Sequence, residues 1–425
     1  MGKQQIQSLR GMYDLTFADA AKYDYLVAAF KSVAEAAGYA HIETPLLEDQ
    51  ALFERGVGTE TDAVSKEMYA FTDRSDHKVA LRPEFTAGIV RAFIEHGMNS
   101  MPQPVKLYTY GPLFRYDRPQ AGRQRQFNQI NIEVFGESSP SIDAQVIVLA
   151  QRFFKRIRLN NVTLQLNSIG DAACRTKYRK VLVEYLEANS KKLAPVDRER
   201  VEKNPLRVLD SKEASTVAIL ADAPQTLNYL CEACQTHFSG VLEYLDDLGV
   251  AYELNPLLVR GLDYYSRTVF EFFGEREGAQ SALGGGGRYD GLVEMLGGQS
   301  TPAVGFALGI ERILLELEES GVAAANGAQK RVYVASLGEP ARLAAFRLIE
   351  QLLDGGVSAV GAVDRDGIGS QLARADKLGV PYAIIIGQKE VRDETVILRD
   401  MASGAQENLP LADAVAELRS RFGVV

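Results

Sequence analysis

Apolar positions recur with helical spacing near the start of the chain. Residues 17–38 carry hydrophobic side chains three and four positions apart and end at Gly38, a residue that commonly stops a helix. The chain then becomes extended around Pro45, and a second helix is predicted across residues 84–96. The first part of the chain therefore mixes helices with extended segments.

Two later stretches alternate apolar and polar residues with the period of a β-strand. They are residues 105–117 and 126–136, and the loop between them, residues 118–125, has the sequence RPQAGRQR. Alternation of this kind is typical of strands with one buried face. We predict an antiparallel pair joined by a long hairpin that is rich in arginine.

The second strand of this pair has two different faces. Its apolar residues share one face, and Gln129, Asn131 and Glu133 share the other, because successive side chains alternate across a strand. A solvated sheet face is the ordinary interpretation of such polar positions. A binding site is favoured here because residues 114–126 contain four Arg and one Asp, hence 4 − 1 = +3, and planar guanidinium groups suit phosphate oxygens. The pattern predicts a site for a phosphorylated, partly cationic ligand.

The pattern changes twice in the second half of the chain. Residues from about 171 to 250 are dense in charge and in helix-forming residues, which indicates a mostly helical insertion. Small residues at 320–330 predict a linker, and beyond it strands and helices alternate as in a small α/β domain with a largely parallel sheet. We predict an α+β domain at residues 1–325, interrupted by the insertion, and a separate α/β domain at residues 331–425.

Composition narrows the class of protein. The chain has 425 residues with 47 Lys and Arg against 56 Asp and Glu, a net charge of −9, which argues against sequence-blind coating of nucleic acid. Three cysteines are too few for a disulfide framework and indicate a reducing cytoplasm. Since no run of 18 apolar residues occurs, we expect no membrane span.

Three further segments carry candidate chemistry. Residues 258–272, LVRGLDYYSRTVFEF, present Arg260 and then two tyrosines just before a strand. Residues 284–292, GGGGRYDGL, lack the Lys-Ser/Thr ending of a P-loop; the glycines allow either a close approach to a ligand or a glycine hairpin. In residues 305–313, GFALGIERI, Arg312 lies off the buried stripe of a predicted helix.

A short cysteine motif stands apart from these segments. Cys231, Cys234 and His237 follow the spacing C-x2-C-x2-H, but a structural zinc site needs four ligands. Cys174 would have to supply the fourth from far away in the sequence. We therefore predict no protein-bound metal.

These segments together resemble the class II aminoacyl-tRNA synthetases, and within them the histidyl-tRNA synthetase family, over nearly the whole chain. Three motifs are shared by many class II enzymes: GYAHIETPLLEDQALFERGVG, FRYDRPQAGRQRQFNQINIEVFG and TPAVGFALGIERI. Two more, LVRGLDYYSRTVFEF and GGGGRYDGL, resemble peptides peculiar to the histidine enzymes. The resemblance implies ATP-dependent activation of L-histidine, with Mg2+ accompanying ATP, transfer to tRNA(His), and a homodimer.

The resemblance also implies roles for individual residues. Arg115 and Arg260 are the catalytic cations, and both also contact histidine. The other histidine-binding residues are Glu84, Thr86, Gln129, Glu133, Tyr264, Tyr265 and Tyr289. The ATP-binding residues are Arg115, Arg123, Phe127 and Arg312. The residues that meet the acceptor end of tRNA are Arg118, Gln120, Arg123 and Arg125, and residues 331–425 resemble the family's anticodon-binding module.

The sequence departs from the usual family pattern at a few positions. Phe85 stands where many bacterial members have Gly, Asn128 where His is usual, and Asp117 where Glu is usual. Leu283 and Gly284 stand where a Cys-Ala or similar pair often precedes the Gly-Gly-Arg-Tyr-Asp run. None of these changes removes a residue to which chemistry is assigned.

Two other functions remain as alternatives. One is a catalytically silent paralogue that serves as a regulatory subunit of ATP phosphoribosyltransferase. Such relatives typically lack the C-terminal domain and the arginine-bearing peptide, whereas this chain keeps Arg260, Arg115, Arg312 and residues 331–425. The other is a class II enzyme for Pro, Thr or Gly, which does not account for LVRGLDYY or for Glu133 together with Tyr265.

Overall fold

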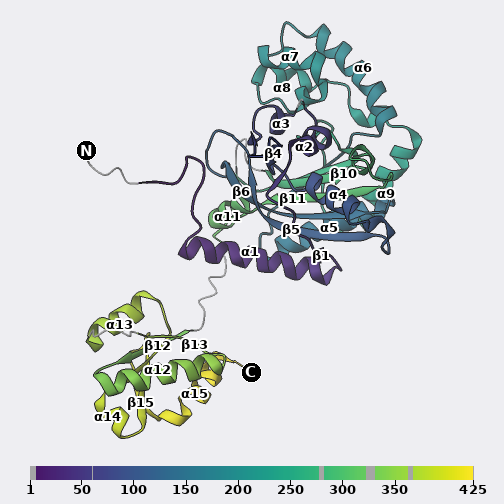
Figure 1. The fold of residues 1–425 in the computed structure, drawn as a ribbon. Helices are drawn as coiled ribbons and strands as arrows, with labels where there is room; N and C mark the ends of the chain where they lie inside the picture. Colours follow the sequence, from purple (N-terminus) through teal and green to yellow (C-terminus); the bar gives the residue numbers. More distant parts are fainter. Residues whose placement is uncertain (1–5, 60, 277–281, 322–330, 362–366, 425) are drawn as a thin grey trace, which may run out of the picture. The chain divides into compact units, whose positions relative to one another are not determined.

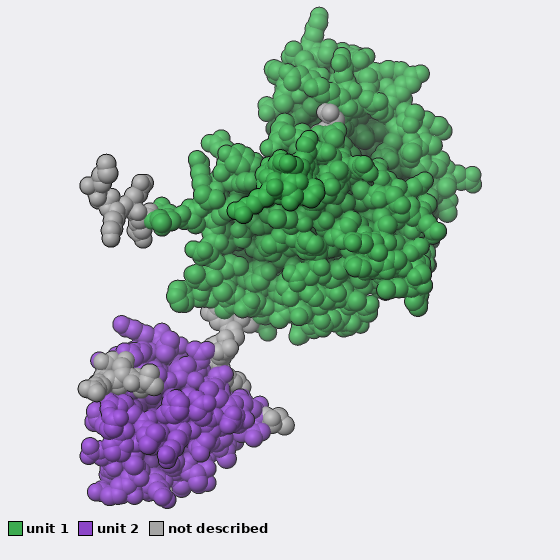
Figure 2. All heavy atoms as spheres, in the orientation of Figure 1, with its two compact units in different colours: residues 1–324 green, residues 325–425 purple. Residues whose placement is uncertain are grey.

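The computed structural model describes residues 6–59, 61–276, 282–321, 331–361 and 367–424. By their internal contacts, the residues fall into two units, Met1–Ala324 and Ala325–Val425 (Figures 1 and 2). The linker predicted at 320–330 lies almost entirely outside the described residues. In the described part of the chain, no helix is both long enough and apolar enough to cross a membrane.

An eight-stranded sheet forms the centre of the first unit. Its order is β1 (Ala40–His41), β5 (Val105–Phe114), β6 (Gln126–Phe135), β11 (Ala303–Gly309), β10 (Ala282–Arg288), β9 (Ser266–Phe273), β7 (Thr163–Ser168) and β8 (Glu253–Leu254). Neighbours are antiparallel except at the two edges, where β1 pairs parallel with β5 and β8 with β7. The predicted antiparallel pair with its long hairpin is confirmed as β5 and β6.

Helices cover both faces of this sheet. The helices α1 (Phe17–Ala36), α5 (Pro140–Arg156), α9 (Glu232–Asp247) and α11 (Ile310–Glu319) pack on one face. The apolar side of β6, with Ile130 and Ile132 fully buried, faces this layer. The helices α4 (Thr86–Glu95) and α10 (Leu292–Met295) pack on the other face. The two N-terminal helices predicted from periodicity are therefore confirmed as α1 and α4.

A small subdomain adjoins α4. It consists of the three-stranded sheet β2 (Leu47–Asp49), β4 (Lys78–Leu81) and β3 (Ala70–Thr72), with α2 (Gln50–Val57), α3 (Asp62–Ser65) and the short 3-10 helix η1 (Met98–Ser100). The side chains of Leu52, Phe53 and Val57 on α2 bury against Ala87 of α4. This packing fixes the N-terminus of α4 beside the sheet.

The segment between β7 and β8 is mostly helical. It contains α6 (Ala172–Ala188), α7 (Pro195–Lys203), η2 (Pro205–Asp210), α8 (Ala214–Leu220), η3 (Thr226–Tyr229) and α9. In Figure 1, α6, α7 and α8 gather at the upper end of the unit. Tyr178, Leu182 and Val208 belong to a separate apolar cluster there, so this part has a core of its own.

The second unit is a five-stranded sheet with helices. Its elements are β12 (Arg331–Ser336), α12 (Glu339–Asp354), β13 (Ser358–Gly361), α13 (Ile368–Lys377), β14 (Tyr382–Ile386), α14 (Gln388–Arg392), β15 (Thr395–Asp400), β16 (Gln406–Pro410), η4 (Leu411–Asp413) and α15 (Ala414–Phe422). β12 pairs parallel with β13 and β14, which confirms the predicted parallel pairing for these three strands. β15 and β16 extend it antiparallel and were missed in the sequence.

Candidate active site

A polar cavity opens over the central strands of the first unit. Its volume is about 360 Å³. Every residue assigned above to histidine or ATP lines it: Glu84, Thr86, Arg115, Arg123, Phe127, Gln129, Glu133, Arg260, Tyr264, Tyr265, Tyr289 and Arg312. Residues from five separate stretches of sequence therefore meet in one place.

Glu133 forms the floor of the cavity and is only 1 % exposed. Its carboxylate accepts hydrogen bonds from Thr86 Oγ1 at 2.6 Å, from Asn131 Nδ2 at 3.1 Å and from the Tyr289 hydroxyl. All three donors are neutral, and their hydrogen bonds offset only part of the effect of burial. Burial therefore raises the pKa of Glu133 to about 8. The polar face of β6 is thus a buried site rather than a solvated sheet face.

A glycine on the neighbouring strand makes room for this carboxylate. Gly305 of β11 pairs directly with Glu133 of β6. A Cβ atom at position 305 would lie 1.7 Å from Glu133 Oε2, which no side chain tolerates. Gly305 carries no signal of its own in the sequence, and its role depends on the pairing of β6 with β11.

Three tyrosines enclose the cavity beside Glu133. The ring centroid of Tyr264 lies 4.7 Å from that of Tyr265 and 5.5 Å from that of Tyr289. All three side chains are buried, and burial raises the pKa of each phenol. They are therefore neutral groups that both donate and accept hydrogen bonds. In this structure Glu133 bonds to Tyr289, whereas the resemblance paired it in function with Tyr265.

The N-terminus of α4 supplies Glu84 and Thr86. The Glu84 carboxylate accepts hydrogen bonds from the backbone N–H groups of Thr86 and Ala87, each at 2.7 Å. Burial raises its pKa, although these two bonds act in the opposite direction. The helix end thus holds a buried carboxylate at the edge of the cavity in one fixed orientation.

The hairpin strands and α11 supply two half-buried arginines. Arg115 donates from Nε to the Pro83 carbonyl at 2.9 Å, and its guanidinium carbon lies 5.4 Å from the centre of the Phe127 ring. Arg312 donates to the carbonyls of Ala282 at 2.7 Å and Gly122 at 3.2 Å. Neither arginine forms a salt bridge in the part of the chain that the structure describes. Burial lowers the pKa of both guanidinium groups.

Arg260 is held differently. Its Nη1 lies 2.7 Å from Glu271 Oε1 on β9. Burial alone would lower the pKa of Arg260, but Glu271 and Tyr265 raise it above its ordinary value. Its Nε is buried without a hydrogen-bond partner among the described residues, and so is Oδ1 of Asn131. Glu271 was missed in the sequence, although a charged residue inside the apolar run VFEFF is a usable signal.

The hairpin itself places its polar residues mostly outside the cavity. Arg118 and Gln120 are exposed, and Arg125 lies over the Tyr116 ring at 3.8 Å. Arg123 lines the cavity and pairs with Asp117 and Glu67. The four residues expected at the tRNA acceptor end therefore form an exposed loop with one member at the cavity edge.

The unusual residues near the site have clear structural partners. Asn128 donates to Glu311 Oε1 from its backbone N–H at 2.8 Å and from Nδ2 at 2.9 Å. Phe85 is 1 % exposed and lies 4.6 Å beneath the Arg82 guanidinium.

The glycine run forms the interior of a strand, so the glycine-hairpin alternative is wrong. β10 is paired on both sides, with β9 and β11. A Cβ atom at Gly285 would lie 3.0 Å from Arg260 Nη1 and 2.3 Å from the Phe270 carbonyl. These glycines let the backbone pack closely and leave space for Arg260. Arg288, at the end of the run, is fully buried and pairs with Asp143 of α5, away from the cavity.

The histidine of the C-x2-C-x2-H motif, His237, has a different partner in the structure. His237 Nε2 lies 2.8 Å from Asp143 Oδ2, and both residues are buried. Asp171 and Cys174 approach Cys231 and Cys234 instead. Cys174 is distant only in the sequence.

Comparisons with known proteins agree with this geometry. A family model described as histidyl-tRNA synthetase matches residues 11–313, and one described as an anticodon binding domain matches residues 331–421. A histidine–tRNA ligase of Pelotomaculum thermopropionicum is 45% identical, with 97% of each chain covered. One from Desulforamulus reducens is 44% identical, with 97% of this chain and 98% of the relative covered.

Solved structures lead to the same family. The apo histidyl-tRNA synthetase of S. aureus has a TM-score of 0.82 and 34% identity, covering 98% of this chain and 100% of the other. A protein from Bacillus halodurans C, described as an ATP phosphoribosyltransferase regulatory subunit/histidyl-tRNA synthetase, has a TM-score of 0.65 at 21% identity, covering 90% and 99%, and shares the fold. The α+β fold is that of the class II synthetases, and the chain belongs to the histidyl-tRNA synthetase family.

Proposed function

We propose that this chain activates L-histidine with ATP to histidyl-adenylate and transfers the histidyl group to the 3′ end of tRNA(His). The observation that carries the proposal is Glu133, a buried carboxylate with only neutral donors, facing a cavity lined by three tyrosines. Histidine differs from its near isosteres in having two ring nitrogens. The carboxylate and a phenol give each ring nitrogen a hydrogen-bond partner. With an apolar analogue, the carboxylate and the phenol would have no such partner on the ligand.

The two ends of the amino acid occupy different parts of the cavity in this proposal. Glu133 and Tyr265 bind the imidazole nitrogens, and Tyr264 and Tyr289 line the ring. Glu84, Thr86 and Gln129 bind the α-amino group. The fixed orientation of Glu84, held by two backbone N–H groups, supports this assignment.

The nucleotide occupies the arginine-lined part. Phe127 and Arg312 enclose the adenine, Arg115 binds the α-phosphate, and Arg123 and Arg312 reach the outer phosphates. Mg2+ enters with ATP, since it binds phosphates together with one or two carboxylates. Glu271 and Glu311 line the cavity and are carboxylates of the required kind.

Catalysis is electrostatic in this account. The histidine carboxylate attacks the α-phosphorus in line, so two negatively charged groups must meet. Arg115 and Arg260 reduce that repulsion and stabilise the charge that develops in the transition state. Glu271 holds Arg260 at the cavity wall before substrates bind. The reaction requires no protein nucleophile.

Transfer to tRNA involves the exposed hairpin and the second unit. Arg118, Gln120, Arg123 and Arg125 meet the acceptor end, and residues 331–425 bind the anticodon. The exposure of Arg118 and Gln120 supports this role. We further propose a cytoplasmic homodimer, which sedimentation at micromolar concentration would test.

A silent regulatory paralogue is the alternative. The full set of cavity arginines and tyrosines and the anticodon-domain match favour the enzyme. The test is exchange of pyrophosphate into ATP by the purified chain, with each amino acid in turn. We expect exchange with histidine alone, followed by charging of tRNA(His). A folded protein with no histidine-dependent exchange would establish the paralogue instead.

A further inference from the structure

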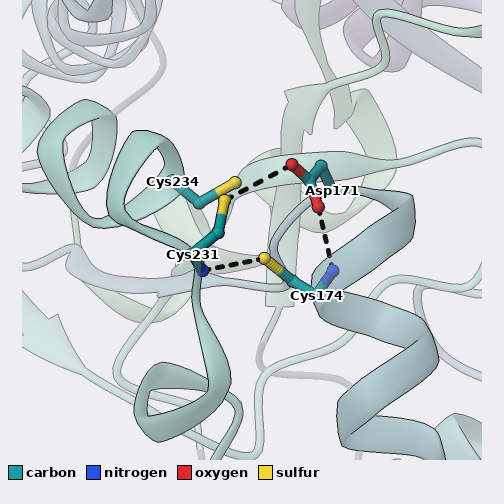
Figure 3. Close-up of side chains that lie close together, drawn as sticks. All are labelled: Asp171, Cys174, Cys231 and Cys234. Atoms are coloured by element: carbon teal, nitrogen blue, oxygen red, sulfur yellow. Dashed lines mark hydrogen bonds between the residues drawn. The ribbon is translucent and has the colours of Figure 1, made fainter.

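Four side chains suited to a soft metal ion meet where the helical segment leaves and rejoins the sheet. Asp171, Cys174, Cys231 and Cys234 each offer one ligand atom, and these atoms lie within 4.8 Å of one another (Figure 3). Cys174 and Cys231 are 57 positions apart in the sequence. None of the four lines the active-site cavity.

The four residues occupy equivalent places on two helices. Asp171 caps the N-terminus of α6, and Cys174 lies three residues later; Cys231 and Cys234 have the same positions on α9. The N-cap and third helical residue of one helix lie on the same side of its first turn, as in a capping box. Two helix N-termini therefore direct their ligands at one point, and their dipoles favour negative charge there.

Backbone donors already point at the ligand atoms. The Cys231 N–H donates to Cys174 Sγ at 3.0 Å, and the Cys174 N–H donates to Asp171 Oδ1 at 2.9 Å. The Cys231 thiol lies 3.5 Å from Asp171 Oδ2 (Figure 3). Hydrogen bonds to thiolate and carboxylate atoms orient metal ligands and favour their charged forms. Leu230 and Leu227 pack against the cluster, in which Cys174 and Cys234 are buried and Asp171 and Cys231 are half-buried.

We propose that Asp171, Cys174, Cys231 and Cys234 bind one Zn2+ ion in a tetrahedral site of three thiolates and one carboxylate. Structural zinc sites are four-coordinate, with a Zn–S distance of about 2.3 Å, which separates neighbouring sulfur atoms by about 3.8 Å. The ligand atoms already lie within 4.8 Å of one another, close to the spacing of such a site. Sulfur-rich tetrahedral sets select zinc over hard cations, and three thiols cannot all pair as disulfides within one chain.

The zinc ion would hold both ends of the helical segment against the sheet. The next residue after Cys174 is Arg175, whose Nη1 donates to the Tyr265 carbonyl at 3.0 Å. Gly170, just before Asp171, accepts from the Arg267 N–H at 2.8 Å. The site would therefore stabilise the start of β9 and the segment just before it, which carries Tyr264 and Tyr265, without contacting substrate.

The test begins with the metal content of the full-length chain, without an affinity tag, expressed in zinc-supplemented medium. We expect about one zinc per chain by mass spectrometry of the digested protein. X-ray absorption at the zinc edge should show three sulfur neighbours and one oxygen neighbour. Both measurements use the unaltered chain, so they do not depend on whether a variant folds.

Variants identify the ligands. C174S and C234S should each reduce zinc content at least tenfold, whereas E232Q should keep it, because Glu232 lies between two ligands but is exposed. The proposal would be overturned if the chain contained less than a tenth of a zinc ion and all three cysteines reacted freely with a thiol reagent. A disulfide found by mass, or equal zinc loss in E232Q, would overturn it too. Histidine-dependent exchange by a zinc-free wild-type chain would leave the proposed function standing, so the two proposals fail separately.

Discussion

Glu133 and Asp143 are both buried carboxylates of the same unit, yet their surroundings are opposite. Asp143, fully buried, faces two potentially cationic partners, with Arg288 Nε at 3.1 Å and His237 Nε2 at 2.8 Å. Burial opposes its ionisation, but His237 and Arg288 hold its pKa below the usual value. Glu133 has only hydroxyl and amide donors, and its pKa rises to about 8.

The difference separates a structural carboxylate from a functional one. The Asp143 carboxylate has its hydrogen-bond and ion-pair partners within the protein, and together they link α5, β10 and α9. It therefore needs no ligand. Glu133 faces the cavity with no cationic partner, so ionising its carboxyl group costs stability until a ligand with N–H groups arrives. An amide in place of each carboxylate should therefore have opposite consequences.

The largest effect is expected from E133Q on activity. Glutamine keeps the shape but places an N–H group where the imidazole needs an acceptor, so histidine-dependent exchange should fall about 10⁴-fold. The fold should be at least as stable as that of the wild type. E243Q, at an exposed glutamate, is the matched control and should leave both unchanged. Near-normal exchange in E133Q would remove Glu133 from the imidazole site.

The next effect is that of D143N on stability. Removing one partner of a buried pair leaves Arg288 uncompensated, so the free energy of unfolding should fall by about 3–5 kcal/mol. Urea denaturation monitored by circular dichroism measures this, and exchange per folded molecule should change only a few-fold. A D143N chain as stable as the wild type would show that the buried group is dispensable.

A smaller loss is expected for R260A. Its interaction is mainly with charge in the transition state, so adenylate formation should fall about 10²–10³-fold while histidine binding stays measurable. Single-turnover kinetics separates the two quantities, and R260K should recover part of the rate. Equal turnover in R260A would mean that Arg260 only supports Glu271.

The smallest effect, counted per pH unit, is a pH dependence of stability. Glu133 has a pKa raised from 4.5 to about 8, so between these values the unfolded chain loses a proton that the folded chain keeps. The wild type should therefore lose stability relative to E133Q as pH rises through this range, by at most about 1.4 kcal/mol per unit. Urea titrations of both chains from pH 5 to 9 measure the difference. A difference that does not change with pH contradicts the assigned environment.

Asp143 should show the opposite trend. Its lowered pKa contributes stability that is present above the usual Asp value and is lost as pH falls through the folded-state value. The cost of D143N should therefore shrink in acid.

Local patterns in the sequence predicted the parts of this fold that depend on local physics. Alternation along residues 126–136 placed Glu133 on a polar face, and helical spacing gave α1 and α4, because each pattern is set by a single element. Arg312 was placed correctly for the same reason, since it lies off the buried stripe of α11.

The features that could not be predicted from the sequence depend on pairing between distant segments. Gly305 matters only because β11 pairs with β6, and Glu271 only because β9 lies beside Arg260. Asp171 and Cys174 meet Cys231 only through the packing of α6 and α9 at the ends of the helical segment. The cavity residues also come from distant segments, but they could be predicted because the family motifs mark the residues that such pairing brings together.

The central claim is that the cavity around Glu133 is built for a ring with two nitrogens. Its most direct test is calorimetric binding of L-histidine and of β-(2-thienyl)-L-alanine, an isostere without ring N–H groups, to the wild-type chain. The account predicts that histidine binds at least about 10³-fold more tightly, because the isostere offers neither Glu133 nor the tyrosine a hydrogen-bond partner on its ring. Equal affinity for the two ligands would contradict it.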